Sequence, residues 1–394
     1  MSALYKVLLV HNVYQQAGGE DSVVQAELEM LRQRGHPVEL FSRHNDVVRT
    51  LPSVTVARQT FWSRESARDF EALLKTFQPD VVHVHNTLAM ISPAIYWEAD
   101  RLRTPVVQTL HNFRLLCPQG NFFREGRVCE DCLGQLPWRG ALRACYRDSV
   151  AQSTVLAGML MFHRAIGTWQ HKVTRYIALN DFCRTKFVRG GLPAEKILTK
   201  PNFVNFPAPI AVARDGFLFV GRLSHLKGLG ILANAAKDLQ NPPIRVAGTG
   251  PDSAVLLGIQ GIELLGPLEL TEVQAEMTRA SALVLPSVCF DSFPRTLVEA
   301  FGCGLPVIAS RMGSFPELVQ DGETGLLFES GNAKDLAEKM RWAQTNPAAM
   351  LKMGQQARAK FETLYTEESN YRQLMSIYAD AIQAMQSGSY ENHR

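Results

Sequence analysis

The sequence predicts an α/β protein with two doubly wound domains that face each other across a cleft. Strand patterns alternate with helical patterns in both halves of the chain, and the stretch 201–209, with three prolines and little periodicity, is typical of a linker. A chain of 394 residues fits two domains of about 150–200 residues each. We therefore expect an N-terminal domain over 1–205, a C-terminal domain over 206–366 and a last helical segment over 367–394.

The first half of the chain opens with a strand and then alternates between helices and strands. The apolar run Lys6–Val10 predicts the first strand, and the helical periodicity of Asp21–Arg34 ends at Gly35. Further buried strands are expected at Val38–Phe41, Val81–His85, Val106–Leu110 and Tyr176–Leu179. Strands that alternate with helices form a parallel sheet, and ligands bind at the carboxyl ends of its strands.

The second half repeats this alternation after the linker. Strands are expected at Phe217–Val220, Ile244–Ala247, Ile262–Leu265, Leu283–Leu285 and Val307–Ala309, with helices between them. The stretch from Glu367 to Met385 is helical in pattern. The two halves therefore predict domains of the same architecture and similar size.

Charge, hydropathy and cysteine content exclude several classes of protein. The net charge of +3, from 41 basic and 38 acidic residues, is too small to indicate nucleic-acid binding. No window approaches the run of ~20 apolar residues that a membrane span needs. The first residues lead straight into a strand, so we expect no secretory signal, and seven cysteines then fit a reducing compartment. The sequence predicts a cytoplasmic protein.

Two carboxylates, Asp291 and Glu299, flank the expected start of a helix in the second half. Ser292 is suited to the N-cap and Pro294 to the first turn, so the helix should begin between the two acids. A helix N-terminus offers backbone N–H groups to an anion, and acids on either side could accept hydrogen bonds from hydroxyls. A nucleotide-sugar has this layout of ribose, diphosphate and hexose.

The alternative interpretation of this pair is a solvated loop acid followed by a buried helix acid with a structural partner. Glu299 lies in the apolar helical sequence Leu-Val-Glu-Ala-Phe, where an unpaired carboxylate is costly to bury. We therefore expect Glu299 to have a specific hydroxyl or cation partner.

Two glycine-containing loops carry the residues expected to bind phosphate. After the strand that ends at Gly221, Arg222 and Lys227 offer a guanidinium fork and a compact ammonium that could neutralise a diphosphate. The paired glycines Gly18 and Gly19, between the first strand and helix, let backbone approach a phosphate. Taken alone, Arg222 and Lys227 are equally compatible with solvated loop cations. The glycine loop lacks the full Gly-x-Gly-x-x-Gly pattern and, taken alone, better fits an ordinary strand-to-helix turn.

Three histidines, His83, His85 and His111, lie at the ends of predicted strands of the N-terminal domain. A histidine in this position is more often a hydrogen-bonded structural residue than a catalyst. Three together favour a site at this edge of the sheet.

The segment 113–149 breaks the alternation and is expected to be an insertion. It contains a possible structural zinc site with one Cys-x-x-Cys pair, formed by Cys117, Cys129, Cys132 and Cys145. The alternative is that these cysteines are small buried apolar residues. Arginines and apolar residues over 139–175 could form a basic surface that docks on anionic lipid, although an ordinary, partly buried helix is the more common outcome.

Taken together, these motifs resemble those of the retaining glycosyltransferases of family 4, whose GT-B fold pairs two Rossmann-like domains. The resemblance spans nearly the whole chain. The motifs that carry it are Val220-Gly221-Arg222 with Lys227-Gly228, Ala247-Gly-Thr-Gly250-Pro251, Leu285-Pro-Ser287, Asp291 with Glu299-Ala300, and Gly304-Leu-Pro-Val-Ile308. In such proteins the final helix crosses back onto the N-terminal domain, which the resemblance implies here for 367–394.

The resemblance also implies a role for each candidate residue. Arg222 and Lys227 would bind the diphosphate, Glu299 the ribose hydroxyls and Asp291 the hydroxyls of the donor sugar, while His111 would lie beside the anomeric carbon. The implied catalytic residues are His111, Arg222, Lys227 and Asp291. The implied donor-binding residues are Gly18, Gly19, Gly221, Arg222, Lys227, Ser292, Phe293, Thr296 and Glu299.

The function implied is transfer of a hexose from a nucleotide-diphosphate sugar, by family frequency a UDP-sugar, to a glycan or lipid-linked acceptor in polysaccharide biosynthesis. No residue is placed as a covalent nucleophile, so the resemblance implies same-face attack in which a leaving-phosphate oxygen takes the acceptor proton. Catalysis is expected to need no metal ion or other cofactor. The expected partners are the donor, the acceptor and the inner face of a membrane, without nucleic acid.

Two alternatives from other classes stay open. Asp291 replaces the glutamate usual in the family, and Ser292-Phe293-Pro294 replaces a glycine-rich run. Such departures also fit a non-catalytic nucleotide-sugar-binding component of a polysaccharide assembly complex. Another GT-B enzyme, such as an epimerase or a phosphorylase, is the second alternative.

Overall fold

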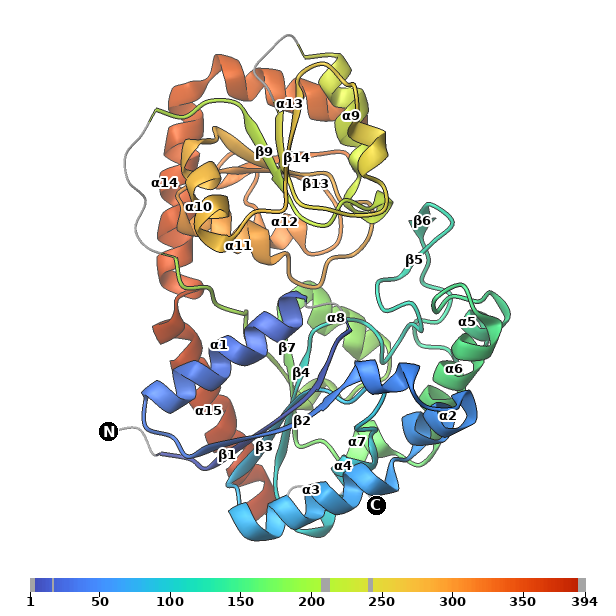
Figure 1. Cartoon of the computed structure of the whole chain (residues 1–394). Coiled ribbons are helices and arrows are strands. Elements are labelled where there is room, and N and C mark those ends of the chain that lie inside the picture. The colour runs from blue at the N-terminus through green and yellow to red at the C-terminus, as the bar shows by residue number, and fades with distance from the viewer. Residues whose placement is uncertain (1–3, 16–17, 207–212, 240–243, 389–394) are drawn as a thin grey trace. The chain divides into compact units, whose positions relative to one another are not determined.

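A computed structural model describes residues 4–15, 18–206, 213–239 and 244–388, which form two compact units (Figure 1). The N-terminal unit comprises Met1–Asn121, Glu130–Pro201 and Asn370–Arg394, and the C-terminal unit comprises Phe122–Cys129 and Asn202–Ser369. Positions 207–209 of the predicted linker lie outside the described residues.

The described strands of the N-terminal unit form a six-stranded parallel sheet in the order β2-β1-β3-β4-β7-β8. They are β1 (Val7–Val13), β2 (Val38–His44), β3 (Val81–Asn86), β4 (Val106–Leu110), β7 (Arg175–Ala178) and β8 (Ile197–Thr199). Central strands such as β3 and β4 are buried at nearly every position, as expected where helices cover both faces of a parallel sheet. All five strands predicted in this half are confirmed, the first of them as Val7–Val13, whereas β8 was not predicted.

Helices connect these strands, and a helix from the far end of the chain joins them. The helices are α1 (Gly19–Gln33), α2 (Ser53–Phe61), α3 (Arg64–Phe77), α4 (Ala94–Arg101), α6 (Val150–Ala165), α7 (Thr168–His171), α8 (Asp181–Arg189) and, in its larger part, α15 (Glu367–Gln386). In α15 the Tyr371 hydroxyl lies 2.9 Å from His36 Nε2, and the Tyr378 hydroxyl lies 2.8 Å from His83 Nδ1. These contacts fix α15 in the N-terminal unit.

The described strands of the C-terminal unit form a second six-stranded parallel sheet in the order β11-β10-β9-β12-β13-β14. They are β9 (Phe217–Val220), β10 (Ile244–Ala247), β11 (Ile262–Gly266), β12 (Ala282–Leu285), β13 (Val307–Ser310) and β14 (Gly325–Phe328). The helices are α9 (Leu229–Lys237), α10 (Leu270–Arg279), α11 (Arg295–Gly302), α12 (Phe315–Leu318), α13 (Ala333–Thr345) and α14 (Pro347–Leu364). All five strands predicted in this half are confirmed.

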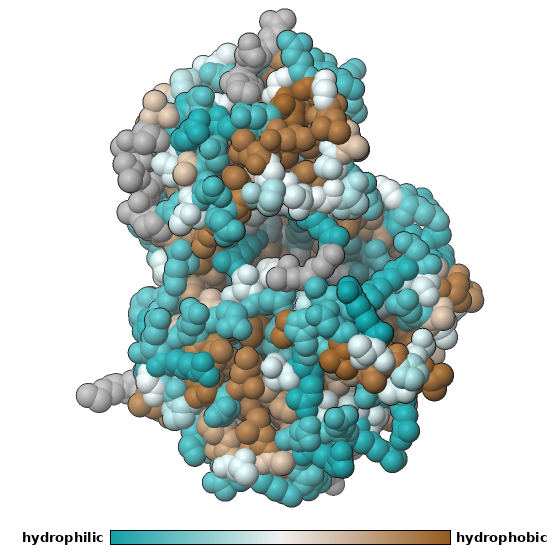
Figure 2. All heavy atoms as spheres, in the orientation of Figure 1, coloured by the Kyte–Doolittle hydropathy of each residue, from teal (hydrophilic) through white to brown (hydrophobic). Residues whose placement is uncertain are grey.

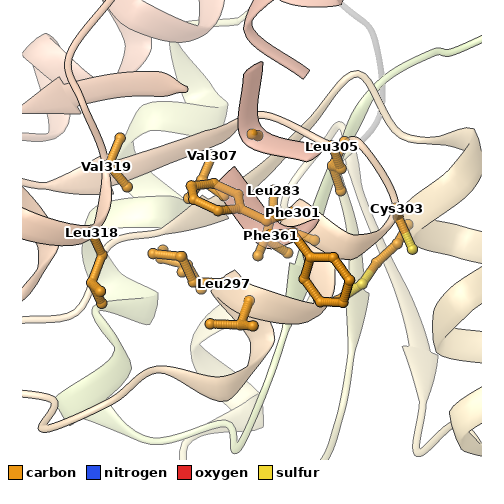
Figure 3. Packing of buried hydrophobic residues seen from close by; sticks show 14 of the residues in the cluster. Leu283, Leu297, Phe301, Cys303, Leu305, Val307, Leu318, Val319 and Phe361 are labelled. Carbon is orange, nitrogen blue, oxygen red and sulfur yellow. The ribbon is translucent and has the colours of Figure 1, made fainter. Parts of the chain in front are cut away.

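The core of the C-terminal unit holds α11 against the sheet (Figure 3). Leu297 and Phe301, four residues apart on α11, lie on one helix face and are fully buried. They belong to one cluster with Leu283 of β12, Val307 of β13 and Phe361 of α14. The N-terminus of α11, where the predicted acids lie, is thereby anchored to a rigid sheet.

The predicted insertion adds short elements to this framework. It contains the two-residue strands β5 (Phe123–Arg124) and β6 (Arg127–Val128) and the helix α5 (Trp138–Leu142). Glu125 and Gly126 join the strands with φ of 50° and 77°, which is the left-handed geometry of a tight hairpin turn. The contacts of Phe122–Cys129 group this hairpin with the C-terminal unit.

One predicted helix start is wrong in detail. The N-cap of α11 is Pro294, with φ −73° and ψ 96°, and not Ser292. Pro294 is suited to this position because it fixes φ and lacks an N–H that would need a partner. The helix still begins between Asp291 and Glu299. No helix in the described part of the chain is both long and apolar enough to cross a bilayer.

Candidate active site

The loops after the neighbouring strands β9 and β12 come together at the carboxyl edge of the C-terminal sheet. The Val288 amide donates a hydrogen bond of 3.0 Å to the Leu226 carbonyl. Gly228, with φ 73°, packs so closely on the second loop that a Cβ at this position would collide with the Pro286 carbonyl. The loop that carries Lys227 is therefore held against the loop that carries Asp291.

Lys227 and Asp291, which the sequence assigns to separate contacts, form an ion pair with each other. Lys227 Nζ lies 2.7 Å from Asp291 Oδ1 and 2.9 Å from Oδ2. Burial is the largest single effect and lowers the pKa of Lys227, but the charge of Asp291, its hydrogen bond and the nearby Cys289 together outweigh burial and leave the pKa raised. The side chains are 31% and 19% exposed, so the pair is accessible to a ligand.

Two serines orient Asp291 from both sides. Ser287 Oγ donates to Asp291 Oδ2 at 3.0 Å, and Ser314 Oγ donates to the Asp291 carbonyl oxygen at 2.7 Å. Arg222 is exposed at the start of the β9 loop, five residues before Lys227. The loop pair thus presents two cations and an oriented carboxylate, as binding of a diphosphate and hydroxyls would require.

Glu299 has the cation partner that its sequence context predicts. Its carboxylate accepts a hydrogen bond of 2.9 Å from Arg295 Nε, one helical turn earlier. Burial raises the pKa of Glu299 more than Arg295 lowers it. The partner was not identified from the sequence, although the i, i+4 spacing of Arg295 and Glu299 is a recognisable signal. Ser292, Phe293 and Thr296 are partly exposed around the same helix start.

In the N-terminal unit, the predicted histidines lie in a buried polar network. His85 Nδ1 is 2.9 Å from His111 Nε2, and His83 Nε2 is 2.8 Å from Thr109 Oγ1. Burial lowers the pKa of His111 to about 3 and lowers the pKa of His83 and His85 well below the usual value. All three rings are therefore neutral at pH 7, which favours a structural role for His83 and a hydrogen-bonding role for His111.

Glu27 of α1 and Lys200 after β8 complete this network. Lys200 Nζ lies 2.9 Å from Glu27 Oε1, while Glu27 Oε2 lies 3.4 Å from His85 Nε2 and 3.5 Å from His83 Nδ1. Glu27, His83 and His85 are also the set of possible metal ligands that the described residues bring within 4.8 Å of one another. The Lys200 ammonium already supplies the positive charge that a metal ion would bring.

The paired glycines open α1 as predicted, but Asp21 uses part of their hydrogen-bonding capacity. The Gly18 amide donates to Asp21 Oδ2 at 2.8 Å, and His11 Nε2 lies 2.8 Å from Asp21 Oδ1. A Cβ at Gly19 would meet nothing within 4 Å. The described residues therefore leave room for a ligand beside Gly19.

Glu20, an acid next to these glycines whose side chain is only 9% exposed, was not identified from the sequence. Tyr14 donates to Glu20 Oε2 at 3.0 Å, and burial raises the pKa of Glu20 to about 8. The sequence pattern Gly-Gly-Glu-Asp gives no sign that the side chain of the first acid is largely buried while the second caps the helix.

The same unit contains a pocket of about 750 Å³ between the loop after β2, helix α2 and the start of α6. This volume lies within the range of small-molecule sites, about 300–1,000 Å³. Its existence also could not be predicted, because its walls come from five separate stretches of sequence.

Family profiles match both halves of the chain. The profile described as "Glycosyl transferase 4-like domain" matches residues 18–202, and the profile described as "Glycosyl transferases group 1" matches residues 206–360. The chain belongs to the family 4 glycosyltransferases.

Relatives of this family 4 glycosyltransferase differ in how much of the chain they cover. An uncharacterised glycosyltransferase of Methanocaldococcus jannaschii is 39% identical over 129 residues, which are 31% of this chain and 36% of that protein. A D-inositol 3-phosphate glycosyltransferase of Mycobacterium sp. (strain KMS) is 28% identical over 363 residues, covering 84% of this chain and 77% of that protein. The structure of Anabaena HepE in complex with UDP-glucose matches with a TM-score of 0.64 at 16% identity, over 97% of this chain and 100% of that one. The last match confirms the GT-B fold.

The structure of this glycosyltransferase does not support the zinc site predicted at Cys117, Cys129, Cys132 and Cys145. Cys117 and Cys132 are buried, and Cys129 and Cys145 are partly exposed. The possible ligand set found among the described residues is the different one of Glu27, His83 and His85.

Proposed function

We propose that this family 4 glycosyltransferase transfers a hexose from a UDP-sugar to a glycan or lipid-linked acceptor in polysaccharide biosynthesis, with retention of configuration and without a catalytic metal ion. The observation that carries the proposal is the Lys227–Asp291 ion pair, which Ser287 orients where the β9 and β12 loops meet. HepE, which shares the fold, is known in complex with UDP-glucose. That likeness supports a UDP-sugar as the donor.

The ion pair accounts for how a donor could be recognised in two parts. A diphosphate that reaches Lys227 would compete with the Asp291 carboxylate for the ammonium group, and exposed Arg222 would add a bidentate contact. The released carboxylate, still oriented by Ser287, could then accept hydrogen bonds from sugar hydroxyls. Glu299, one oxygen of which contacts Arg295, is the candidate for the ribose hydroxyls.

In the proposed reaction, the bond between the anomeric carbon and the phosphate oxygen breaks as the acceptor oxygen attacks the same face. The acceptor hydroxyl proton passes to the leaving phosphate oxygen, so the products are a glycoside and UDP. Arg222 and Lys227 would stabilise the charge that grows on the diphosphate, the task for which many enzymes use a metal ion. His111, a neutral ring, would contact the sugar through a hydrogen bond and not through charge.

A thermal-shift panel of UDP, UDP-glucose, UDP-galactose and GDP-mannose, each with and without a chelator, tests the donor. A ligand that binds the native state raises the melting temperature by mass action. A shift with a UDP-sugar that survives chelation supports the proposal. An unchanged melting temperature with every nucleotide would contradict the proposal.

Turnover separates the enzyme from a non-catalytic binding protein. With the donor identified, release of UDP and formation of a glycoside are measured for the wild type and for Arg222→Ala. We expect Arg222→Ala to fold normally and to lose most of its turnover. Donor binding without any transfer to a range of glycan acceptors would instead favour the non-catalytic alternative.

A further inference from the structure

The pocket of about 750 Å³ in the N-terminal unit has a charge pattern that identifies a class of ligand. Three arginines, Arg49, Arg114 and Arg147, contribute to its lining. Among the described residues that line it there is no aspartate or glutamate, and the neighbouring acid Glu20 is engaged by the Tyr14 hydroxyl. A pocket with several cations and no acid in its wall favours an anionic ligand.

Two of the arginines, from separate segments of the chain, lie over one aromatic ring. Arg114 Cζ lies 5.0 Å and Arg147 Cζ lies 5.4 Å from the centre of the Tyr146 ring, which also lines the pocket. Arg114 additionally donates from Nη1 to the Pro118 carbonyl at 3.2 Å. A guanidinium has five N–H donors, so this contact leaves Arg114 donors for an oxyanion.

The loop that carries Tyr146 and Arg147 is tied down where it enters α6. The Tyr146 amide donates to Ser153 Oγ at 2.8 Å, and Ser149 caps the helix by accepting from the Gln152 amide. Arg147 has φ 54°, a left-handed conformation that is uncommon outside glycine and that persists only when its surroundings hold it. The part of the cationic wall that this loop supplies is therefore held in place by the protein's own contacts.

The rest of the pocket lining combines aliphatic residues with uncharged polar ones such as Asn45 and Gln152. Residues of α2, the loop before it and α6 contribute aliphatic side chains, including Val48, Leu51, Val56 and Leu156. A free inorganic anion would gain nothing from this surface, whereas an apolar group attached to the anion would be removed from water on it. The two walls together fit an amphipathic anion.

We propose that this pocket binds the acceptor through a phosphate or diphosphate ester, with the group attached to the phosphate on the apolar wall. The proposal rests on the glycosyltransferase function and names the chemical class of its acceptor. Arginine is suited to this task because its planar fork matches phosphate oxygens bidentately.

Two sources could supply this chemistry, a lipid-linked saccharide or a soluble phosphate ester. Exposed apolar side chains on neighbouring segments are a reason to test the lipid source. Leu142 of α5 is 71% exposed and Val54 of α2 is 81% exposed. Figure 2 shows hydrophobic atoms on the right-hand edge of the view, where Figure 1 draws α5.

Binding is measured by calorimetry with three probes: decyl phosphate below its micelle concentration, decyl maltoside as its neutral counterpart, and glucose 1-phosphate as a soluble phosphate ester. The test variant is the double substitution Arg49→Gln/Arg147→Gln, because both side chains are exposed. The matched control is Arg58→Gln, an exposed arginine of α2 outside the pocket lining.

We expect at least one phosphate probe to bind the wild type, and the double variant to bind it at least tenfold more weakly while Arg58→Gln is unchanged. A preference for decyl phosphate indicates the lipid source, and a preference for glucose 1-phosphate indicates the soluble one. Equal binding of decyl maltoside, no binding of either phosphate, or phosphate binding unchanged in the double variant would overturn the proposal.

A separate readout distinguishes this proposal from the proposed function. UDP binding and melting temperature are measured for the double variant, and both should match the wild type. If UDP-sugar turnover is present but acceptors without phosphate are used as well as phosphorylated ones, the glycosyltransferase function stands and the acceptor proposal fails.

Discussion

The polar groups at the carboxyl edges of the two sheets are built in opposite ways. In the N-terminal unit, Glu27 and Lys200 are 1% and 0% exposed and contact each other, and Glu27 also lies beside His83 and His85. In the C-terminal unit, Lys227 and Asp291 form a partly exposed pair between two loops. A buried pair cannot exchange partners without leaving a charge unpaired in the interior, whereas the exposed pair can exchange Asp291 for a phosphate. We infer that the first network positions residues and the second binds ligand.

Breaking the buried pair should have the largest effect on folding. Lys200→Met leaves the Glu27 carboxylate without its cation in the interior, and we expect a loss of about 3–5 kcal/mol in the free energy of unfolding. Urea denaturation measures this loss. The control is Arg311→Gln, which breaks an exposed pair with Asp321 and should change stability little. If Lys200→Met unfolds like the control, the network is not structural.

Breaking the partly exposed Lys227–Asp291 pair should lower turnover strongly and stability little. Lys227→Met is expected to reduce turnover of the donor about 100- to 1,000-fold, because a cation that stabilises the leaving diphosphate is lost. The same variant should change the free energy of unfolding by less than about 1 kcal/mol, since the pair is partly exposed. Lys237→Met, an exposed lysine of α9, is the matched control. A stability loss as large as that of Lys200→Met would contradict the contrast between the two sites.

Acid should destabilise the protein through the buried histidines. Burial lowers the pKa values of His83, His85 and His111. In mildly acidic solution these histidines are therefore protonated in the unfolded chain but neutral in the folded one. Stability should therefore fall as the pH drops below about 6.5, the usual histidine value. Each group adds up to about 1.4 kcal/mol per pH unit to this dependence.

Urea denaturation at pH 7.5 and 5.5 measures this slope. In His85→Gln the slope should be shallower than in the wild type, because one of the groups that titrate only on unfolding is gone. His44→Gln, in which an exposed histidine is replaced, provides the comparison. Identical slopes in wild type and His85→Gln would show that His85 is protonated in the folded protein.

The contrast also explains which parts of the structure were predictable from the sequence. Strands such as Phe217–Val220 are runs of apolar residues, and their pattern is local, so nearly all of them were predicted correctly. Arg222, Lys227, Asp291 and Glu299 could be chosen as candidate site residues because they lie in short motifs around strand ends, and their roles stay predictions. The direct pairing of Lys227 with Asp291 could not be predicted, because it depends on two loops that only the sheet brings together.

The buried network of the N-terminal unit was mostly beyond sequence reasoning. Glu27 and Lys200 are 173 residues apart, and Tyr378, which contacts His83, is 295 residues from it. No local pattern marks such partners, since each residue taken alone is an ordinary helix or loop residue. The sequence placed the histidines at strand ends. It did not show that their rings are neutral or that His85 and His111 share a hydrogen bond.

The smallest expected effect tests whether the orientation of Asp291 matters for donor binding. Ser287 is buried and donates to Asp291 Oδ2, so Ser287→Ala removes one hydrogen bond from the carboxylate and should weaken donor binding by about 1 kcal/mol, or about fivefold. Ser314→Ala removes a hydrogen bond to the main-chain carbonyl of the same residue and leaves the carboxylate contacts intact. It should lower stability by a similar amount but change donor affinity less. Calorimetric titration of both variants with the donor decides the point, and equal affinity losses would show that the carboxylate itself is not what the donor recognises.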